Sequence, residues 1–254
     1  MSESYITKLV GDEQRVDGRK FDQFREIKIE TDFIKTAEGS ARIKIGKTDV
    51  VVGIKLSVGE PYPDSPDEGV LAVNTELSPI ASPEFEPGPP GEESIEISRV
   101  IDRGIRESKC VDLEKLCIEA GKKVWMINVD VHVLDHDGNI IDAGGLAAIA
   151  ALLKTKIPIL EDDVIKYGEY EKKLEVKDTP IPITTAKIAG KFLIDPNLEE
   201  EQAMDARITL TSTKDGNICS IQKGGIGYLT KEEIEKATDL SIAKGKELRK
   251  LLGM

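Results

Sequence analysis

The chain has 254 residues, of which 39% are hydrophobic and 32% charged, and its net charge at neutral pH is −12. This length suffices for one large or two modest domains with a buried core. No apolar run approaches the roughly 20 residues of a membrane helix, and the N-terminus shows no signal peptide, so we expect a cytoplasmic protein without membrane contact. The acidic charge excludes a general basic surface for nucleic acid. Three cysteines without a CxxC spacing exclude a disulfide framework.

The first half of the chain is predicted to consist mainly of strands. Apolar patterns and turn residues predict the following elements in chain order: strands at Ser40–Ile45, Val50–Leu56 and Gly69–Leu77, helices at Ser94–Ser108 and Asp112–Ala120, and a strand at Lys123–Leu134. Residues 61–90 hold eight of the twelve prolines, with acidic residues between them. We therefore expect that stretch to form long surface loops on either side of the strand predicted at Gly69–Leu77.

The second half repeats the order of strands followed by a helix. Asp142 is a candidate N-cap for a helix at Ala143–Leu153, and Thr230 with Glu233 forms a capping box before the last helix. Strands are predicted at Thr185–Ile194, Ala206–Thr213 and Ile218–Gln222. The pattern indicates an α+β fold with two related halves, 1–160 and 185–254, joined by a connecting region at 161–184.

The predicted helix Ser94–Ser108 carries arginines along one side. Arg99, Arg103 and Arg106 fall within an arc of about 60°, away from the apolar residues of the helix. Guanidinium groups suit phosphate because their planar fork donates paired hydrogen bonds. An ordinary solvated face explains the same spacing, because nearby acidic residues can pair with the arginines locally. Spacing alone leaves both interpretations open.

Two other patterns are weaker candidates for functional sites. His132 and His136, with Asp135 and Asp137, have a spacing that gathers metal ligands only on a helix, whereas this segment is predicted to be a strand and a turn. The glycines of 224–227 lack both the lysine of a phosphate-binding loop and the spacing of a dinucleotide fingerprint. No metal site and no cofactor are therefore expected at either place.

A cluster of carboxylates extends from Asp195 through 199–201 to Asp205. Such clusters can hold Mg²⁺ for phosphate chemistry, but they are more often solvated loops. Arg207 lies beside the cluster and weakens the metal interpretation, because it can neutralise part of the charge.

Several segments, taken together, resemble one protein family. The segments that carry the resemblance are 15–19 (RVDGR), 38–41 (EGSA) with 46–50, 96–106 (EISRVIDRGIR), and 130–134 (DVHVL) with the Asp137-Gly138 turn. In this order and spacing they resemble the RNase PH family, whose members degrade RNA from the 3′ end with inorganic phosphate. Within it, 74–79 (NTELSP), 83–90 (PEFEPGPP) and 100–108 (VIDRGIRES) resemble the non-catalytic subunit of the archaeal exosome.

The resemblance implies an RNase PH-like fold and a hexameric ring of alternating catalytic and non-catalytic subunits, with RNA-binding cap subunits and single-stranded RNA as further partners. It also implies that each active site lies near the boundary between the two kinds of subunit. Arg99, Arg103 and Arg106 would then contact RNA.

The expected phosphate site departs from the pattern of active members. Active members of the family place a Thr/Ser-Arg pair after the Asp-Gly turn to hold the attacking phosphate, whereas this chain has Ile140 and Ile141 there. Aliphatic side chains donate no hydrogen bond, so phosphate would lack its ligands.

The expected catalytic pair is also altered. Active members carry two aspartates six residues apart, and an ungapped count places Glu201 and Arg207 at these positions. A shift of two residues places Glu199 and Asp205 there instead, so this departure is less certain than the loss of the phosphate ligands. The chain is therefore predicted to be catalytically inactive.

Two alternatives remain open from the sequence. An active phosphorolytic nuclease with unfamiliar site residues is opposed by Ile140 and Ile141, and less firmly by Arg207. A purely structural ring subunit without RNA contact is opposed by the retained arginines. A phosphorolysis assay on the chain alone, and mixed with a catalytic sister subunit, distinguishes these alternatives.

Overall fold

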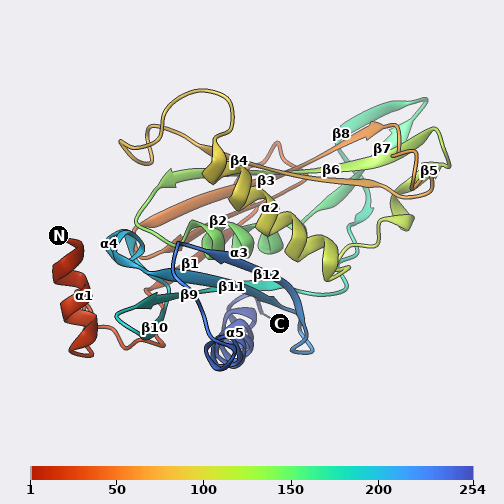
Figure 1. Cartoon of the computed structure of the whole chain (residues 1–254). Helices are drawn as coiled ribbons and strands as arrows, with labels where there is room; N and C mark the ends of the chain where they lie inside the picture. Colours follow the sequence, from red (N-terminus) through yellow and green to blue (C-terminus); the bar gives the residue numbers. More distant parts are fainter. Residues whose placement is uncertain (1, 254) are drawn as a thin grey trace.

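The structure is a computed structural model that describes residues 2–253, and it consists of two sheets with a pair of helices packed between them (Figure 1). The first sheet has the order β1-β2-β3-β6-β4, with β5 on the end of β6. Its strands are β1 (Ile27–Thr31), β2 (Gly39–Ile45), β3 (Thr48–Gly59), β4 (Val70–Leu77), β5 (Cys117–Glu119) and β6 (Lys123–Asp135). The α+β class is confirmed.

The second sheet has the order β10-β9-β11-β12 and is antiparallel throughout. Its strands are β9 (Ile181–Ile188), β10 (Lys191–Ile194), β11 (Ala206–Ser212) and β12 (Ile218–Gly224). A separate hairpin of β7 (Lys156–Glu161) and β8 (Val164–Lys173) projects at the upper right of Figure 1.

Two helices, α2 (Glu92–Glu107) and α3 (Ile140–Leu152), fill the space between the sheets. Every residue of α3 is buried, and small residues let it lie close to both sheets. A side chain at Gly145 would collide with Pro182 of β9. The remaining helices are α1 (Glu3–Gly11), which contacts α4 (Leu198–Ala203), and α5 (Lys231–Leu251), which covers the outer face of the second sheet.

One hydrophobic core unites the two halves of the chain. Ile43, Ile54 and Ile127 of the first sheet belong to the same buried cluster as Ile183 of the second sheet and Leu248 of α5. The predicted boundaries after residues 160 and 184 fall inside β7 and β9, so the division into three segments stays a prediction. Among residues 2–253, no helix is long and apolar enough to cross a membrane.

Three expectations about local structure were wrong. Residues 112–120 form a single 3₁₀ turn (Glu114–Leu116) and β5 instead of a helix, because β5 pairs with the start of β6. The strand predicted at Thr185–Ile194 is broken by Ala189 and Gly190, whose positive φ angles turn β9 into β10.

The third error concerns the start of α3. Asn139 occupies the N-cap position, and Asp142 lies inside the helix with no exposed surface. The capping box of Thr230 and Glu233 before α5 is confirmed.

Candidate functional site

A cavity of about 180 Å³ gathers the four residues that depart from the pattern of active family members. Ile140 and Ile141 come from the start of α3, Glu201 from α4 and Arg207 from β11. Its other lining residues are Glu93, Glu96, Ile97, His136 and Met204. Elements that are far apart in sequence thus converge at one site. It lies at the N-terminal end of α3, directly after the Asp137-Gly138 turn.

The turn before α3 fixes how the two isoleucines are presented. Gly138 has a φ of 83°, and a Cβ there would lie 2.5 Å from the backbone carbon of Asn197, so only glycine fits. Asn139 follows with a φ of 60°, and its backbone N–H donates to Glu201 Oε1 over 2.8 Å. Ile140 and Ile141 are 4% and 6% exposed, and their side chains donate nothing to a ligand.

Arg207 is already paired within the chain. Its Nη2 lies 2.5 Å from Glu96 Oε2, and Glu96 Oε1 also accepts a hydrogen bond from Gln222 Nε2 over 3.0 Å. The guanidinium therefore neutralises a carboxylate of α2 and offers little net charge to a bound anion.

The other titratable groups around the cavity offer no positive charge to an anion. Burial raises the pKa of Glu201 to about 7, and burial with repulsion from Glu84 and Glu96 raises the pKa of Glu93. Burial lowers the pKa of His136, so this imidazole is neutral at neutral pH. Phosphate entering the cavity would meet carboxyl groups and an arginine that is already paired.

The structure also bears on which pair occupies the positions of the catalytic aspartates. Glu201 and Arg207 line the cavity, whereas Glu199 and Asp205 are not among the described residues that line it. Asp205 is exposed, and its carbonyl oxygen accepts from the backbone N–H of Gly227 over 2.7 Å. The assignment of the catalytic positions to either pair stays a prediction.

Two carboxylates of the acidic cluster, those of Asp195 and Glu200, are buried and paired with arginines, whereas Asp205 is exposed. Glu200 is 1% exposed and forms a two-bond ion pair with Arg15, at 2.8 Å from Nε and 2.6 Å from Nη2. Asp195 is fully buried and binds Arg19 Nη1 at 2.8 Å and Arg25 Nη2 at 2.7 Å. Burial alone would raise the pKa of Asp195, but the bonds from Arg25 outweigh it and hold the pKa below its usual range.

A buried polar network behind the cavity was not predicted. Asn139 Nδ2 donates to Asp195 Oδ1 over 2.9 Å and to Asp142 Oδ2 over 3.0 Å. Asp142 also accepts from the backbone N–H and the hydroxyl of Thr184 on β9. The opposite charges of the RVDGR segment and the acidic cluster were a sequence signal for the ion pairs of Arg15 with Glu200 and of Arg19 with Asp195. No sequence pattern indicated the contact between Asn139 and Asp142.

The three arginines of α2 differ in what they contact. Arg106 binds Asp102 at 2.7 Å and the carbonyl oxygen of Leu71 at 3.0 Å. Arg103 Nη1 makes longer bonds of 3.3 Å to β12, to the carbonyl oxygen of Ile221 and to Gln222 Oε1. Arg99 is exposed and has no hydrogen-bond or ion-pair partner among residues 2–253. Within the described residues, the guanidinium of Arg99 is therefore free, that of Arg103 is weakly held, and that of Arg106 is fully engaged.

The remaining candidate patterns have structural explanations. His132 Nδ1 lies 3.0 Å from Glu76, and His136 stacks on Phe85 with ring centroids 5.3 Å apart. Gly225 has a φ of 77°, as a tight turn requires. Within residues 2–253, no group of three or more His, Cys, Asp or Glu side chains is placed to hold a metal ion.

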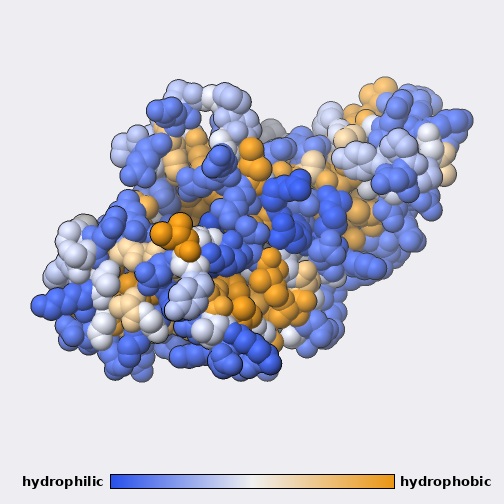
Figure 2. Space-filling view, in the orientation of Figure 1, coloured by the Kyte–Doolittle hydropathy of each residue, from blue (hydrophilic) through white to orange (hydrophobic). Residues whose placement is uncertain are grey.

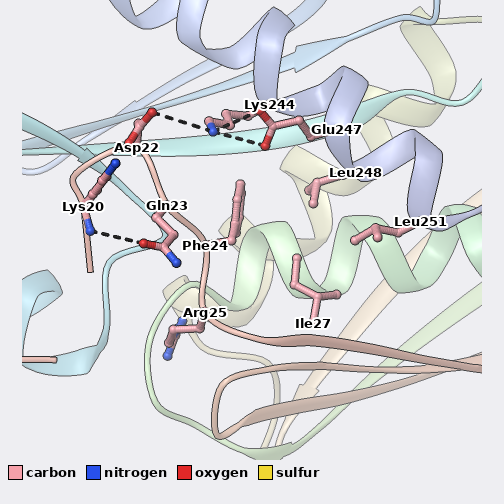
Figure 3. A pocket seen from close by; sticks show the side chains of 10 residues that line it. All are labelled: Lys20, Asp22, Gln23, Phe24, Arg25, Ile27, Lys244, Glu247, Leu248 and Leu251. Carbon is pink, nitrogen blue, oxygen red and sulfur yellow. Dashed lines mark hydrogen bonds and ion pairs between the residues drawn. The ribbon is translucent and has the colours of Figure 1, made fainter. Parts of the chain in front are cut away.

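A larger cavity, of about 630 Å³, lies between residues 20–27 and the end of α5 (Figure 3). Phe24 and Leu248 contribute apolar walls, and Lys244 stands on the rim. Lys244 Nζ lies 3.0 Å from Glu247 and 3.9 Å from Asp22, so its charge is compensated within the chain. None of the sequence-predicted site residues lines this cavity.

Residues 23–158 match the model of the 3′ exoribonuclease family, domain 1, and residues 178–244 match domain 2 of the same family. The chain belongs to the RNase PH family. The resemblance found in the sequence is thus confirmed, and so is the fold that it implied.

Relatives within the RNase PH family are similar over nearly their whole length. The chain is 54% identical to the exosome complex component Rrp42 of Thermococcus gammatolerans, over 97% of this chain and 92% of the relative. It is 51% identical to the component of the same name from Methanocella arvoryzae, over 98% and 94%.

Solved structures agree with these sequence relatives. A chain of the Archaeoglobus fulgidus exosome with RNA bound to the active site superposes with a TM-score of 0.92 at 49% identity, covering 98% of this chain and 96% of that one. Rice Rrp46 superposes with a TM-score of 0.72 at 18% identity, which shows the shared fold alone.

Proposed function

We propose that this chain is a non-catalytic subunit of an archaeal-type exosome ring. It supports 3′-5′ RNA degradation by structuring the active site of a catalytic RNase PH-like sister subunit and by helping to bind RNA. The exosome components to which it is about 50% identical support the assembly. The observation that supports the inactive role is the cavity lined by Ile140, Ile141 and the Arg207–Glu96 pair, which we infer to replace phosphate ligands and catalytic carboxylates.

Phosphorolysis needs an oriented phosphate and stabilisation of the charge that develops on the leaving phosphate oxygen. The side chains of the two isoleucines supply no donor, and Arg207, the one arginine among the described residues that line the cavity, is bound to Glu96. Binding a phosphate dianion would require breaking that pair or placing the anion beside Glu93 and Glu201. Because a broken, partly buried pair leaves a carboxylate uncompensated, the free energy of phosphate binding is unfavourable.

A subunit whose own site is silent can still contribute surfaces to its neighbour. In a ring that alternates two kinds of subunit, each chain presents two different interfaces, and a residue near either one can reach the partner's site. RNA-binding cap subunits and single-stranded RNA complete the assembly, which we place in the cytoplasm. No cofactor is required by this role.

The RNA contact is assigned to α2. Within residues 2–253, Arg99 is exposed without a partner and Arg103 is held only by bonds of 3.3 Å, so both can turn toward a phosphate at low cost. Arg106 is the least suited of the three because Asp102 already neutralises it. Contacts to backbone phosphate would be independent of base sequence.

Co-expression with a catalytic sister subunit tests the assembly. We expect a closed ring with three copies of each chain, measured by light scattering coupled to gel filtration. A chain that stays monomeric in the presence of the sister subunit would contradict the proposed function.

A further inference from the structure

A further concave surface lies at the C-terminal end of β4, beneath the long loop that joins β4 to α2, and it shares Glu93 with the cavity at the start of α3. This groove has a volume of about 550 Å³ and is formed by residues 75–79 and 84–94. The loop above it, drawn in yellow-orange, stands away from the sheets at the upper left of Figure 1. In Figure 2 the same region is an arch of mostly hydrophilic residues over a hollow. We call this surface the loop groove.

Every charged residue that lines the loop groove is acidic. Among the described residues, the lining contains five glutamates and no lysine, arginine or histidine; the glutamates are Glu76, Glu84, Glu86, Glu92 and Glu93. Glu76 lies 3.0 Å from His132 Nδ1, and Arg207 acts on Glu93, whose pKa is nevertheless raised by burial and by repulsion from Glu84. Glu84, Glu86 and Glu92 have no ion-pair partner among the described residues, and a bound cation would relieve the repulsion between these carboxylates.

A buried hydroxyl provides an independent sign of a missing ligand. Thr75 lines the groove and is 6% exposed, and its Oγ1 has no hydrogen-bond partner among the described residues. A buried polar atom without a partner costs about 1–3 kcal/mol, so such atoms are rare in folded proteins. A donor that enters the groove would satisfy this oxygen.

The size and shape of the groove select among cations. A bound Mg²⁺ or Ca²⁺ needs several oxygens within roughly 2–2.6 Å, and no three acidic side chains of the described residues are gathered in this way. A longer cation is required to reach glutamates spread over the loop and the start of α2. Phe85 and four prolines of the loop add apolar surface around the charges.

The sheet offers a further contact to an extended chain. β4 is the last strand in the order of the first sheet, so its outer edge has no neighbouring strand. Edge strands commonly bind an extended segment of a second protein through main-chain hydrogen bonds, while pockets beside the edge receive its side chains. We propose that the loop groove binds an extended basic segment of a partner protein, with an arginine or lysine seated among the glutamates and donating to Thr75 Oγ1.

The full-length chain can be titrated against a fluorescein-labelled peptide of alternating arginine and glycine, with fluorescence anisotropy as the readout. A peptide with glutamine in place of arginine is the ligand control. The variant Glu84→Gln/Glu86→Gln should weaken binding by about tenfold, a change of about 1.4 kcal/mol. The matched control Glu169→Gln/Glu171→Gln removes the same charge from the exposed β8 and should change the affinity less than about twofold.

Thr75→Val separates a specific site from general attraction to an acidic protein. Valine keeps the shape of threonine but removes the unpaired hydroxyl, so the free chain should unfold at an equal or higher temperature while binding the peptide about fivefold more weakly. Equal losses in the Glu84/Glu86 and Glu169/Glu171 variants, or unchanged binding by Thr75→Val, would overturn the proposal. Displacement of the peptide by Mg²⁺, but not by a sodium salt of equal ionic strength, would assign the groove to a metal ion instead.

Discussion

Glu96 of α2 and Arg207 of β11 form an ion pair, with 2.5 Å between Glu96 Oε2 and Arg207 Nη2, and both residues line the cavity of about 180 Å³ at the start of α3. This pair links the helix that carries Arg99 and Arg103 to the second sheet. Arg207 is therefore used to hold two elements together.

A single substitution at this pair should not create activity. Arg207→Asp restores an acidic side chain but leaves Ile140 and Ile141 in place and adds a carboxylate beside Glu96. We expect no release of nucleoside diphosphates from RNA by this variant in the presence of phosphate and Mg²⁺. Activity of purified Arg207→Asp chain would show that the phosphate ligands are supplied from elsewhere.

Reversal of charge at Arg99 should weaken RNA binding by the assembled ring. Arg99→Glu removes an exposed guanidinium without breaking a contact within the described residues, so the ring should keep its size on gel filtration. The affinity for RNA should fall, and the slope of log affinity against log salt should flatten by nearly one unit, as expected for loss of one phosphate contact. Phosphorolysis by the ring should slow in parallel.

Lys246→Glu on α5 is the matched control, because it makes the same change of charge at an exposed residue outside α2. Arg103→Glu should behave like Arg99→Glu, since its bonds to β12 are long. If the affinity and the salt slope of both arginine variants equal those of the control, the arginines form an ordinary solvated face.

The buried pair of Arg15 and Glu200 should contribute strongly to stability. Their side chains are 0% and 1% exposed, so Arg15→Met leaves the buried carboxylate of Glu200 with only the backbone N–H of Asn197 at 2.9 Å and the distant Arg19 Nη2 at 3.9 Å, and should cost about 3–5 kcal/mol in urea denaturation. The double variant Arg15→Met/Glu200→Met should recover much of this loss, because no unpaired charge remains. Lys115→Met, which breaks the exposed pair with Glu175, should cause no measurable change.

Asp142 should make stability depend on pH in an unusual direction. Burial raises its pKa in the folded chain from 3.8 to about 7. Between these values the folded chain holds a proton that the unfolded chain releases, so the contribution of Asp142 is present at low pH and is lost as the pH rises toward 7. Asp142→Asn cannot titrate, and its amide can accept from Thr184 N and donate to Thr184 Oγ1.

The variant should therefore gain stability relative to the wild type by about 1.4 kcal/mol per pH unit between pH 5 and pH 7. Urea denaturation of both proteins at pH 5, 6 and 7 measures this difference. Other titrating groups are common to the two proteins and cancel. Parallel stability curves would mean that Asp142 is ionised throughout this range.

The sequence predicted α2 and the strands around it because their apolar residues recur with clear helical or alternating periods. Ile140 and Ile141 were singled out because they follow the Asp137-Gly138 turn, and Glu201 and Arg207 because they precede Asp215-Gly216 by fixed distances. Asp142 was misplaced because an aspartate before an apolar run has the pattern of an N-cap, and only the tertiary structure shows that Thr184 of β9 supplies its donors.

Contacts between distant segments were beyond sequence reasoning. Arg15 and Glu200 are both polar and charged, which favours exposure for each residue taken alone, and their burial follows from the packing of the N-terminal segment on α4. The sequence predicted only a proline-rich surface segment at the residues of the loop groove. Prolines remove the periodicity that would indicate which side chains face inward. The orphan hydroxyl of Thr75 has no signature in a sequence.

The most direct test of the central claim is phosphate-dependent release of nucleoside diphosphates from single-stranded RNA. It should be measured for the purified chain alone, for a catalytic sister subunit alone and for the ring that the two form together. We predict no release by this chain alone, and faster release by the ring than by an equal amount of the sister subunit. Release by this chain alone, abolished by substitution of residues at the Ile140–Arg207 cavity, would contradict the account.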